Sequence, residues 1–378
     1  MRKLHAVALA AMLTTGVTFA QSITLPPSGG NQHASVSQSI GLVNVTIDYH
    51  SPKVHQPRTG EDRHGKIWGT LVPYGMQKGL GYGTCTECPW RAGANENTTF
   101  TVSNDVKVEG QPLAAGTYGL HMIPGQDEWT VVFSKNSTSW GSFFYDPSED
   151  ALRVKVKPVK SEYHEWLTYE FPERQADKTT AALKWEDLAI PFTITVDNPN
   201  ALYIANLRNE LRGSQGGSWE NLAAGAQFAI QNKIALKDAL GWAQRADNPA
   251  YGWENFNTIS VLADAQEANG MTDEAKKTRQ RALNHSSATP VDLHQYARSL
   301  LQQGKKEEAL AVWELNAKRF GEQWPVNVGL ARGNSAVGKY KEALKYAKLA
   351  LAQAPDEQNK KVLQAGIEKL EAGKDMNQ

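Results

Sequence analysis

Three glycines in the C-terminal half recur every 34 residues, at Gly270, Gly304 and Gly338. The same period is kept by Glu-Ala pairs at 274–275, 308–309 and 342–343, and by alanines at 263, 297 and 331. A period of about 34 residues in helix-forming sequence is typical of stacked helical hairpins. Glycine suits the left-handed end of the first helix, and alanine lets two helices approach closely. The period therefore predicts an array of helix pairs, which usually offers a surface to a partner.

The boundaries of this array follow from the same pattern. We expect repeats at about 253–287, 288–321 and 322–355, after a first helical pair at 219–231 and 236–246 and before a polar capping helix at 356–372. Open-ended stacks need such a polar cap for solubility. The sequence changes at residues 197–199 from strand-like alternation to helix-forming residues with helical spacing. We therefore assign 198–218 to a linking helix and a Gly-rich loop, and 219–372 to the helical repeat domain.

The final repeat has a specific resemblance. It carries the small and aromatic residues of the tetratricopeptide repeat at their usual relative positions: Leu330, Ala331, Gly338, Tyr340, Ala343, Ala350 and Pro355. The earlier units are more degenerate, with Asn316 and Gly321 where the pattern has Ala and Pro. The array thus resembles tetratricopeptide repeats, which implies a protein or peptide partner on its concave face.

The first twenty residues have the pattern of an export signal. Arg2 and Lys3 precede a mostly apolar stretch at 7–17, and the small residues Thr18 and Ala20 stand at the two recognition positions for cleavage after Ala20. We predict a signal peptide at 1–20 and an exported protein, periplasmic or extracellular. An uncleaved membrane anchor is the alternative, although the stretch is short for a span. No later stretch approaches about 18 apolar residues, so we expect no transmembrane segment in the mature chain.

Residues 41–197 have the alternation of β-strands. Val43, Val45 and Ile47 alternate with polar residues, and turn residues separate many further short runs. We assign 21–40, rich in Ser, Gly, Pro and Gln, to a flexible leader, and 41–197 to a β-rich domain. The fold prediction is α+β with two domains: an antiparallel β-sandwich or barrel, followed by the helical array.

Charge and motifs exclude several functions. Lys+Arg and Asp+Glu both number 40, a balance that gives no support for nucleic-acid binding. The chain has no G-x-S-x-G, no Gly-rich phosphate loop and no H-E-x-x-H. We therefore expect no cofactor and no metal.

The two cysteines are separated by two residues, as Cys85 and Cys88. A redox pair requires its first thiol at a helix N-terminus, whereas Pro89 and a predicted strand follow here. A zinc site needs four ligands, and two of the histidines would have to supply the others. A short-range disulfide formed after export is the third interpretation, and it is the one we predict.

The candidate ligand residues lie in the β-rich domain. The segment at 90–97 is densely polar: Arg91 is suited to a carboxylate, and Asn95 and Glu96 to ordering a ligand. His121 lies on the opposite face of its predicted strand from Leu120, and His64 belongs to a cluster of histidines near the start of the domain. The alternatives are a turn held by an Arg91–Glu96 pair and solvated histidines. Most of the tryptophans here are expected in the core, with an aromatic groove for sugars as an alternative.

Six segments carry a second resemblance: 65–69 (GKIWG), 71–75 (LVPYG), 90–96 (WRAGANE), 113–118 (LAAGTY), 128–131 (EWTV) and 152–154 (LRV). Through them the β-rich domain resembles the secreted family called domain of unknown function 2911. The family pattern runs almost directly from the Pro-Tyr-Gly to the Trp-Arg, so 76–89 looks like an insertion. The resemblance implies an exported β-rich fold and brings no established activity or catalytic residues.

Two functions follow as hypotheses. The first is a non-catalytic binding protein that uses its helical repeats. The alternative is a hydrolase or carbohydrate-active enzyme with a site around Arg91, Asn95, Glu96 and His121. A structural component of the cell envelope is a third possibility that the balanced charge allows.

Overall fold

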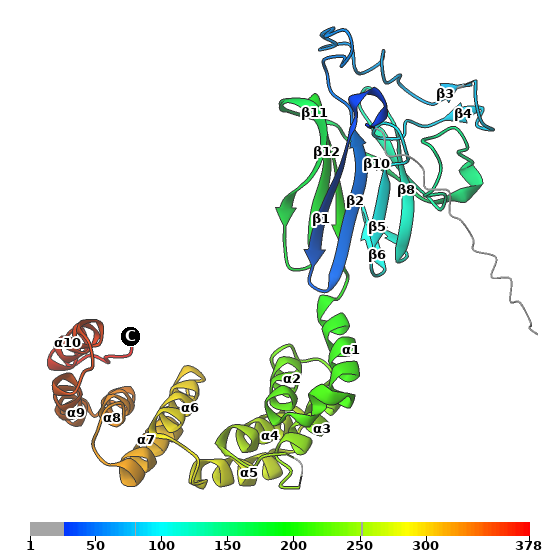
Figure 1. Ribbon diagram of the computed structural model, residues 1–378. Helices are drawn as coiled ribbons and strands as arrows, with labels where there is room; N and C mark the ends of the chain where they lie inside the picture. The colour runs from blue at the N-terminus through cyan, green and yellow to red at the C-terminus, as the bar shows by residue number, and fades with distance from the viewer. Residues whose placement is uncertain (1–25, 80, 251) are drawn as a thin grey trace, which may run out of the picture. The chain divides into compact units, whose positions relative to one another are not determined.

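The computed structural model describes residues 26–79, 81–250 and 252–378, and these divide into two compact units after Pro199 (Figure 1). The first unit is built from antiparallel strands and the second from helices. The predicted two-domain α+β fold is therefore confirmed. The predicted signal peptide at 1–20 lies outside the described residues.

The first unit contains two main antiparallel sheets and a small one among the described residues. The larger has the order β1-β2-β5-β8-β9-β10, with β1 Gln32–Ile40, β2 Val43–Ser51, β5 Thr99–Val102, β8 Gly116–Ile123, β9 Trp129–Ser134 and β10 Asp150–Val156. The second has the order β11-β12-β6-β7, with β11 Val159–Arg174, β12 Lys178–Thr195, β6 Val106–Val108 and β7 Gln111–Leu113. A short hairpin pairs β3 Gln77–Lys78 with β4 Glu87–Cys88. Single 3-10 turns lie at η1 Ser28–Gly30 and η2 Pro147–Glu149.

The two main sheets share one core. Phe133 of β9 contacts both Phe100 of β5, with ring centroids 5.0 Å apart, and Phe192 of β12 in the opposite sheet, at 6.1 Å. Tyr49 of β2 contacts Tyr169 of β11 in the same way, at 4.9 Å. Because rings from both sheets interdigitate, the arrangement is that of a sandwich. Within the described residues neither sheet closes into a barrel.

Two details of the β unit differ from the sequence prediction. The segment 32–40, expected to belong to a flexible leader, is strand β1 and pairs with β2 from Gln32–Ser51 to Ile40–Val43. Its polar residues mislead because an edge strand obtains its hydrogen bonds from one neighbour and leaves much of its surface in water. Two of the short runs that the sequence separates, at 181–185 and 190–195, lie in the single strand β12, in which Glu186 has a positive φ of 56° and the pairing with β11 shifts register.

The second unit is a series of helices joined by short turns: α1 Pro199–Arg212, α2 Trp219–Gln231, α3 Leu236–Ala246, α4 Phe256–Ala268, α5 Thr272–Asn284, α6 Pro290–Gln302, α7 Lys306–Phe320, α8 Val326–Ala336, α9 Tyr340–Ala352 and α10 Glu357–Glu371, with the turn η3 Ser214–Gly217 after α1. The periodic glycines follow α4, α6 and α8 with φ of 77–80°, as predicted. Ala263, Ala297 and Ala331 are fully buried between helices. No helix in the described part of the chain is both long and apolar enough to span a membrane.

The helix pairs do not pack uniformly on one another. Within each pair the helices pack closely, and α3 packs on α4 as α7 packs on α8. Between α5 and α6 the described residues make no comparable backbone contact. The array is therefore interrupted at this junction.

Candidate functional site

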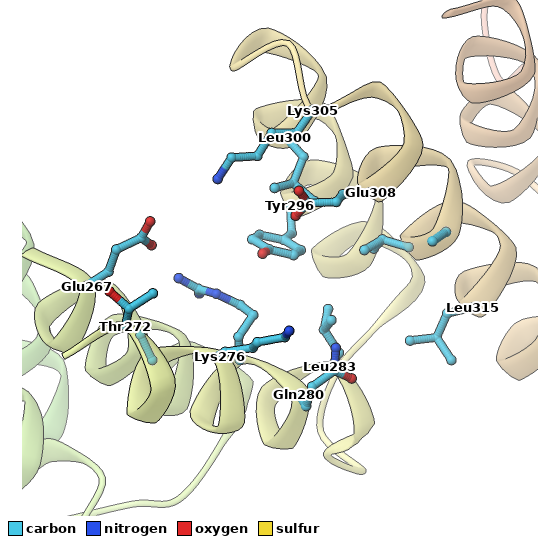
Figure 2. A pocket seen from close by; sticks show the side chains of 14 residues that line it. Glu267, Thr272, Lys276, Gln280, Leu283, Tyr296, Leu300, Lys305, Glu308 and Leu315 are labelled. Carbon is cyan, nitrogen blue, oxygen red and sulfur yellow. The ribbon is translucent and has the colours of Figure 1, made fainter. Parts of the chain in front are cut away.

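An open groove of about 660 Å³ lies at the interrupted junction, and we call it the α5–α7 groove. Figure 2 shows Lys276 and Gln280 on the α5 side, and Tyr296, Lys305 and Glu308 on the opposite side. The apolar lining comes from three helices: Leu283 of α5, Tyr296 and Leu300 of α6, and Val312 and Leu315 of α7. The helix pairs thus leave an apolar depression between them.

Local hydrogen bonds fix the turn between α5 and α6. Helix α6 begins with a capping box, in which the Thr289 side chain accepts from the Asp292 N–H and the Asp292 carboxylate accepts from the Thr289 N–H. The preceding turn is tied down separately, since the Ser287 hydroxyl accepts from the Phe256 N–H at 2.8 Å. These contacts fix the start of α6 and tie the turn that precedes it to the start of α4.

Arg319 of α7 bridges the junction. Its Nη1 donates to the Leu283 carbonyl at 2.5 Å and its Nη2 to the His285 carbonyl at 2.9 Å, at the end of α5. Hydrogen bonds from a charged donor are stronger than neutral ones. Arg319 therefore adds a polar clamp to this junction, beside the buried apolar cluster that Leu283 shares with α6 and α7.

Arg279 and Tyr296 form the wall of the groove. The guanidinium of Arg279 lies over the Tyr296 ring, 5.0 Å from its centroid, and forms an ion pair with Asp264. Burial raises the pKa of the Tyr296 hydroxyl, so this group is protonated at neutral pH. Among the described residues the hydroxyl has no hydrogen-bond partner, which leaves it free to meet a ligand.

The rim of the groove carries charges of both signs. Lys276 and Lys305 face Glu267 and Glu308 around the opening. None of these four side chains forms an ion pair within the described parts of the chain. An apolar floor with unpaired charges around it suits a peptide segment that carries an apolar side chain and both positive and negative groups.

The site residues that the sequence predicts lie in the β unit, and most of them are paired with neighbouring side chains or carbonyls. Arg91 Nη1 donates to the Asn95 carbonyl at 2.5 Å, and the guanidinium lies 5.1 Å from the centroid of the Phe143 ring. Glu96 lies 3.2 Å from His50 Nδ1, so its partner is a histidine and not Arg91. Asn95 Oδ1 accepts from Asn31 at 3.3 Å. The turn is held by Arg91 and Asn95, and the Arg91–Glu96 pair weighed as the alternative is absent from the described contacts.

His121 lies on β8 beneath the insertion at 76–89. The ring contacts Tyr145 at 5.5 Å between centroids, and Tyr145 packs with both cysteines and Val132. Its Nδ1 shares a hydrogen bond of 2.9 Å with the Ser142 hydroxyl. Burial, together with the positive charge of Arg91, lowers the pKa of His121 to about 4. The imidazole is therefore neutral at pH 7 and is a satisfied polar group.

His64 belongs to another part of the unit. Its Nε2 lies 2.7 Å from the Asp187 carboxylate, and its exposed ring meets Tyr163 of β11. The hydrogen bond to Asp187 raises the pKa of His64. The structure brings Arg91, Asn95, Glu96 and His121 into one neighbourhood, each with its own partner, and leaves His64 outside it. This pairing gives no particular support to a hydrolytic site.

Cys85 and Cys88 are joined, with an S–S distance of 2.17 Å. Both are buried against Val132 and Tyr145, so the bridge attaches the segment 76–89 to the outer face of β9. Among the described residues no three His, Cys, Asp or Glu side chains are grouped as ligands of a metal ion.

The sequence does not single out the residues of the α5–α7 groove. Its period places each helix pair, but the groove arises where the backbones of α5 and α6 lie apart, and such a gap has no motif. The one signal is the degeneracy of the middle repeat, in which Asn316 and Gly321 replace the expected Ala and Pro.

Fold and site together define a two-unit protein, in which a β-sandwich precedes an array of helix pairs that carries an open groove. Residues 31–194 match the family described as "Protein of unknown function (DUF2911)", in agreement with the resemblance of the β-rich domain. The match ends before α1, so it leaves the helical unit unassigned. No curated protein matches the chain.

Proposed function

We propose that this protein is an exported, non-catalytic binding protein whose helical unit, a tetratricopeptide-like array, holds a peptide segment of a protein partner in the α5–α7 groove. The single observation that carries the proposal is the groove itself, with its apolar floor and its unpaired rim charges. The 34-residue period supports the same class, because helical arrays commonly present grooves to peptides.

The apolar lining of the groove contributes most of the affinity for a peptide, and the rim charges contribute to its orientation. A ligand side chain that buries roughly 100 Å² of apolar surface against Tyr296 and Leu315 gains about 2.5 kcal/mol. Rim charges in water add little affinity, but they disfavour a peptide that presents like charges to them. Lys276 and Lys305 on opposite sides, with Glu267 and Glu308, favour one direction of the bound segment.

Two observations support export. Residues 1–20 have the order of charge, apolar stretch and small residues of a signal peptide. The Cys85–Cys88 bridge also suits an oxidising compartment. N-terminal sequencing of the protein recovered outside the cytoplasm tests this part; we expect Gln21 first, and an intact Met1 would contradict it.

Binding is tested with defined peptides. The full mature chain is used to select binders from a library of random dodecapeptides, and the enriched peptides are synthesised and titrated by fluorescence anisotropy. Leu315→Glu places a charge on the partly buried floor of the groove and is expected to weaken binding at least tenfold. Tyr296→Ala removes the aromatic wall and is expected to act in the same direction.

The matched control is Val362→Glu, which introduces the same charge on an exposed apolar residue of α10, away from the groove. This variant should bind as the wild type does. The proposal is wrong if the selected peptides bind Leu315→Glu and Val362→Glu equally well, or if no peptide is enriched. Melting temperatures of all variants separate loss of binding from loss of folding.

A further inference from the structure

We propose that the β unit carries a second binding site, for a small organic anion built on a ring, in a cavity beside Trp90 and Trp185. The cavity has a volume of about 390 Å³, within the range of small-molecule sites. Its wall combines two tryptophans with Arg58, Arg63 and the side-chain amides of Asn31 and Gln56. The site is independent of the α5–α7 groove, since it lies in the other unit.

The charge of the wall selects an anion. Of the described residues that line the cavity, only Arg58 and Arg63 are charged, and both are positive. Arg63 donates through Nε to the Val54 carbonyl at 2.9 Å and through Nη2 to the Lys53 carbonyl at 2.7 Å. Neither arginine forms an ion pair within the described parts of the chain. A guanidinium held in place by backbone carbonyls retains donors that match a carboxylate, sulfate or phosphate.

Trp185 provides the second, independent observation. The residue is 1% exposed, and its indole N–H has no acceptor among the described residues. Leaving a buried donor unpaired costs about 1–3 kcal/mol. Trp185 lines the cavity, so a ligand that enters there lies beside the ring that carries this unpaired donor.

The apolar part of the cavity wall is the reason that the proposed ligand contains a ring. Trp90 is 8% exposed and stacks on Trp185, with centroids 6.3 Å apart and planes at 15°. Leu71 and Val72 complete the apolar lining. A compact ring fills such a space, with its anionic group at the arginines. Aromatic acids and sugar acids share this chemistry, and the experiment distinguishes them.

The test uses the full mature chain and four probes: benzoate and glucuronate, with benzyl alcohol and glucose as their neutral counterparts. Binding is measured by calorimetry and by the ¹⁵N–¹H resonance of the Trp185 indole, which Trp185→Phe assigns by its loss. We expect one of the anions to bind and shift this resonance, and its neutral counterpart to bind at least tenfold more weakly. Preference for benzoate identifies an aromatic acid as the ligand class, and preference for glucuronate a sugar acid.

Arg58→Gln is the main variant, because Arg58 is exposed and its loss leaves the fold intact. It is expected to weaken anion binding about tenfold, the loss of roughly one charge-assisted hydrogen bond. The matched control Arg174→Gln removes the same charge from the end of β11 and should bind as the wild type. The proposal is overturned if neither anion shifts the Trp185 indole, if neutral probes bind equally well, or if the two variants weaken binding alike.

Discussion

The Nδ1 atom of His121 lies 2.9 Å from the hydroxyl oxygen of Ser142, in a site where the imidazole is 2% exposed. The hydroxyl satisfies one ring nitrogen, and the neighbouring Arg91 opposes a positive charge on the ring. The pair thus stabilises a neutral histidine under the disulfide-bridged insertion. The stability of the β unit therefore depends on pH.

We predict that the β unit loses stability as the pH falls from about 6.5 to about 4. The pKa of His121 is about 4 in the folded protein, against 6.5 when unfolded, so over this window the unfolded chain takes up a proton that the folded chain does not. The lost stability is about 3 kcal/mol. Urea unfolding followed through the β unit at several pH values measures it.

His121→Gln keeps a partner for Ser142 and removes the titration, so its curve should be flatter over this window. His33→Gln, which removes an exposed imidazole of β1, is the control and should follow the wild type. Parallel pH curves for wild type and His121→Gln would show that His121 is not the group responsible.

Two glycines in helices are expected to respond to alanine in opposite directions. A methyl group on Gly329 of α8 would overlap the ring of Trp313, which is fully buried, so Gly329→Ala should destabilise the helical unit by about 1–3 kcal/mol. At Gly241 of α3 the same methyl group meets open space, and Gly241→Ala should stabilise the unit by about 0.5–1 kcal/mol. Thermal unfolding distinguishes the two, and a stabilising Gly329→Ala would refute the packing described here.

The clamp of Arg319 on the end of α5 is expected to maintain the groove. Arg319→Met preserves much of the side chain but removes two charge-assisted hydrogen bonds, so we expect a loss of about 2 kcal/mol in the free energy of unfolding and weaker binding of a selected peptide. Lys318→Met, at the exposed neighbouring position, is the control. Equal behaviour of the two variants in calorimetry and titration would count against a role for the clamp.

The cap of α6 contributes to the same junction. Thr289→Ala removes the side chain that accepts from the Asp292 N–H, and we expect a loss of about 1 kcal/mol. Thr289→Ser keeps the hydroxyl and should retain most of this stability. Chemical denaturation of both variants gives the comparison; a serine variant as unstable as the alanine variant would exclude the cap as the cause.

Local patterns account for what could be predicted. The helices at 219–231 and 236–246 have the predicted bounds, and Gly270, Gly304 and Gly338 end their helices in the left-handed conformation. The alternation of apolar and polar residues correctly predicted which residues of β2 face the core. Strand β1 escaped prediction because only Ala34, Val36 and Ile40 mark its inner face among many polar residues, and its partner β2 supplies its hydrogen bonds.

The site was less predictable, for a different reason. Arg91, Asn95 and His121 were identified by residue type, but type does not tell which partner each one meets; Ser142 and Phe143, far along the chain, decided that. The groove residues Arg279 and Tyr296 have no motif, and their contact joins side chains of two different helices, α5 and α6.

The sequence by itself determined the two-unit architecture and the period of the helix pairs, because strand alternation, glycine at helix ends and small residues between helices act over a few residues at a time. Only the tertiary structure decided where the array is interrupted and which charges remain unpaired around that gap. It also decided that Trp185 is buried without an acceptor beside two arginines. These properties depend on contacts between residues distant in sequence, and such contacts leave no local pattern.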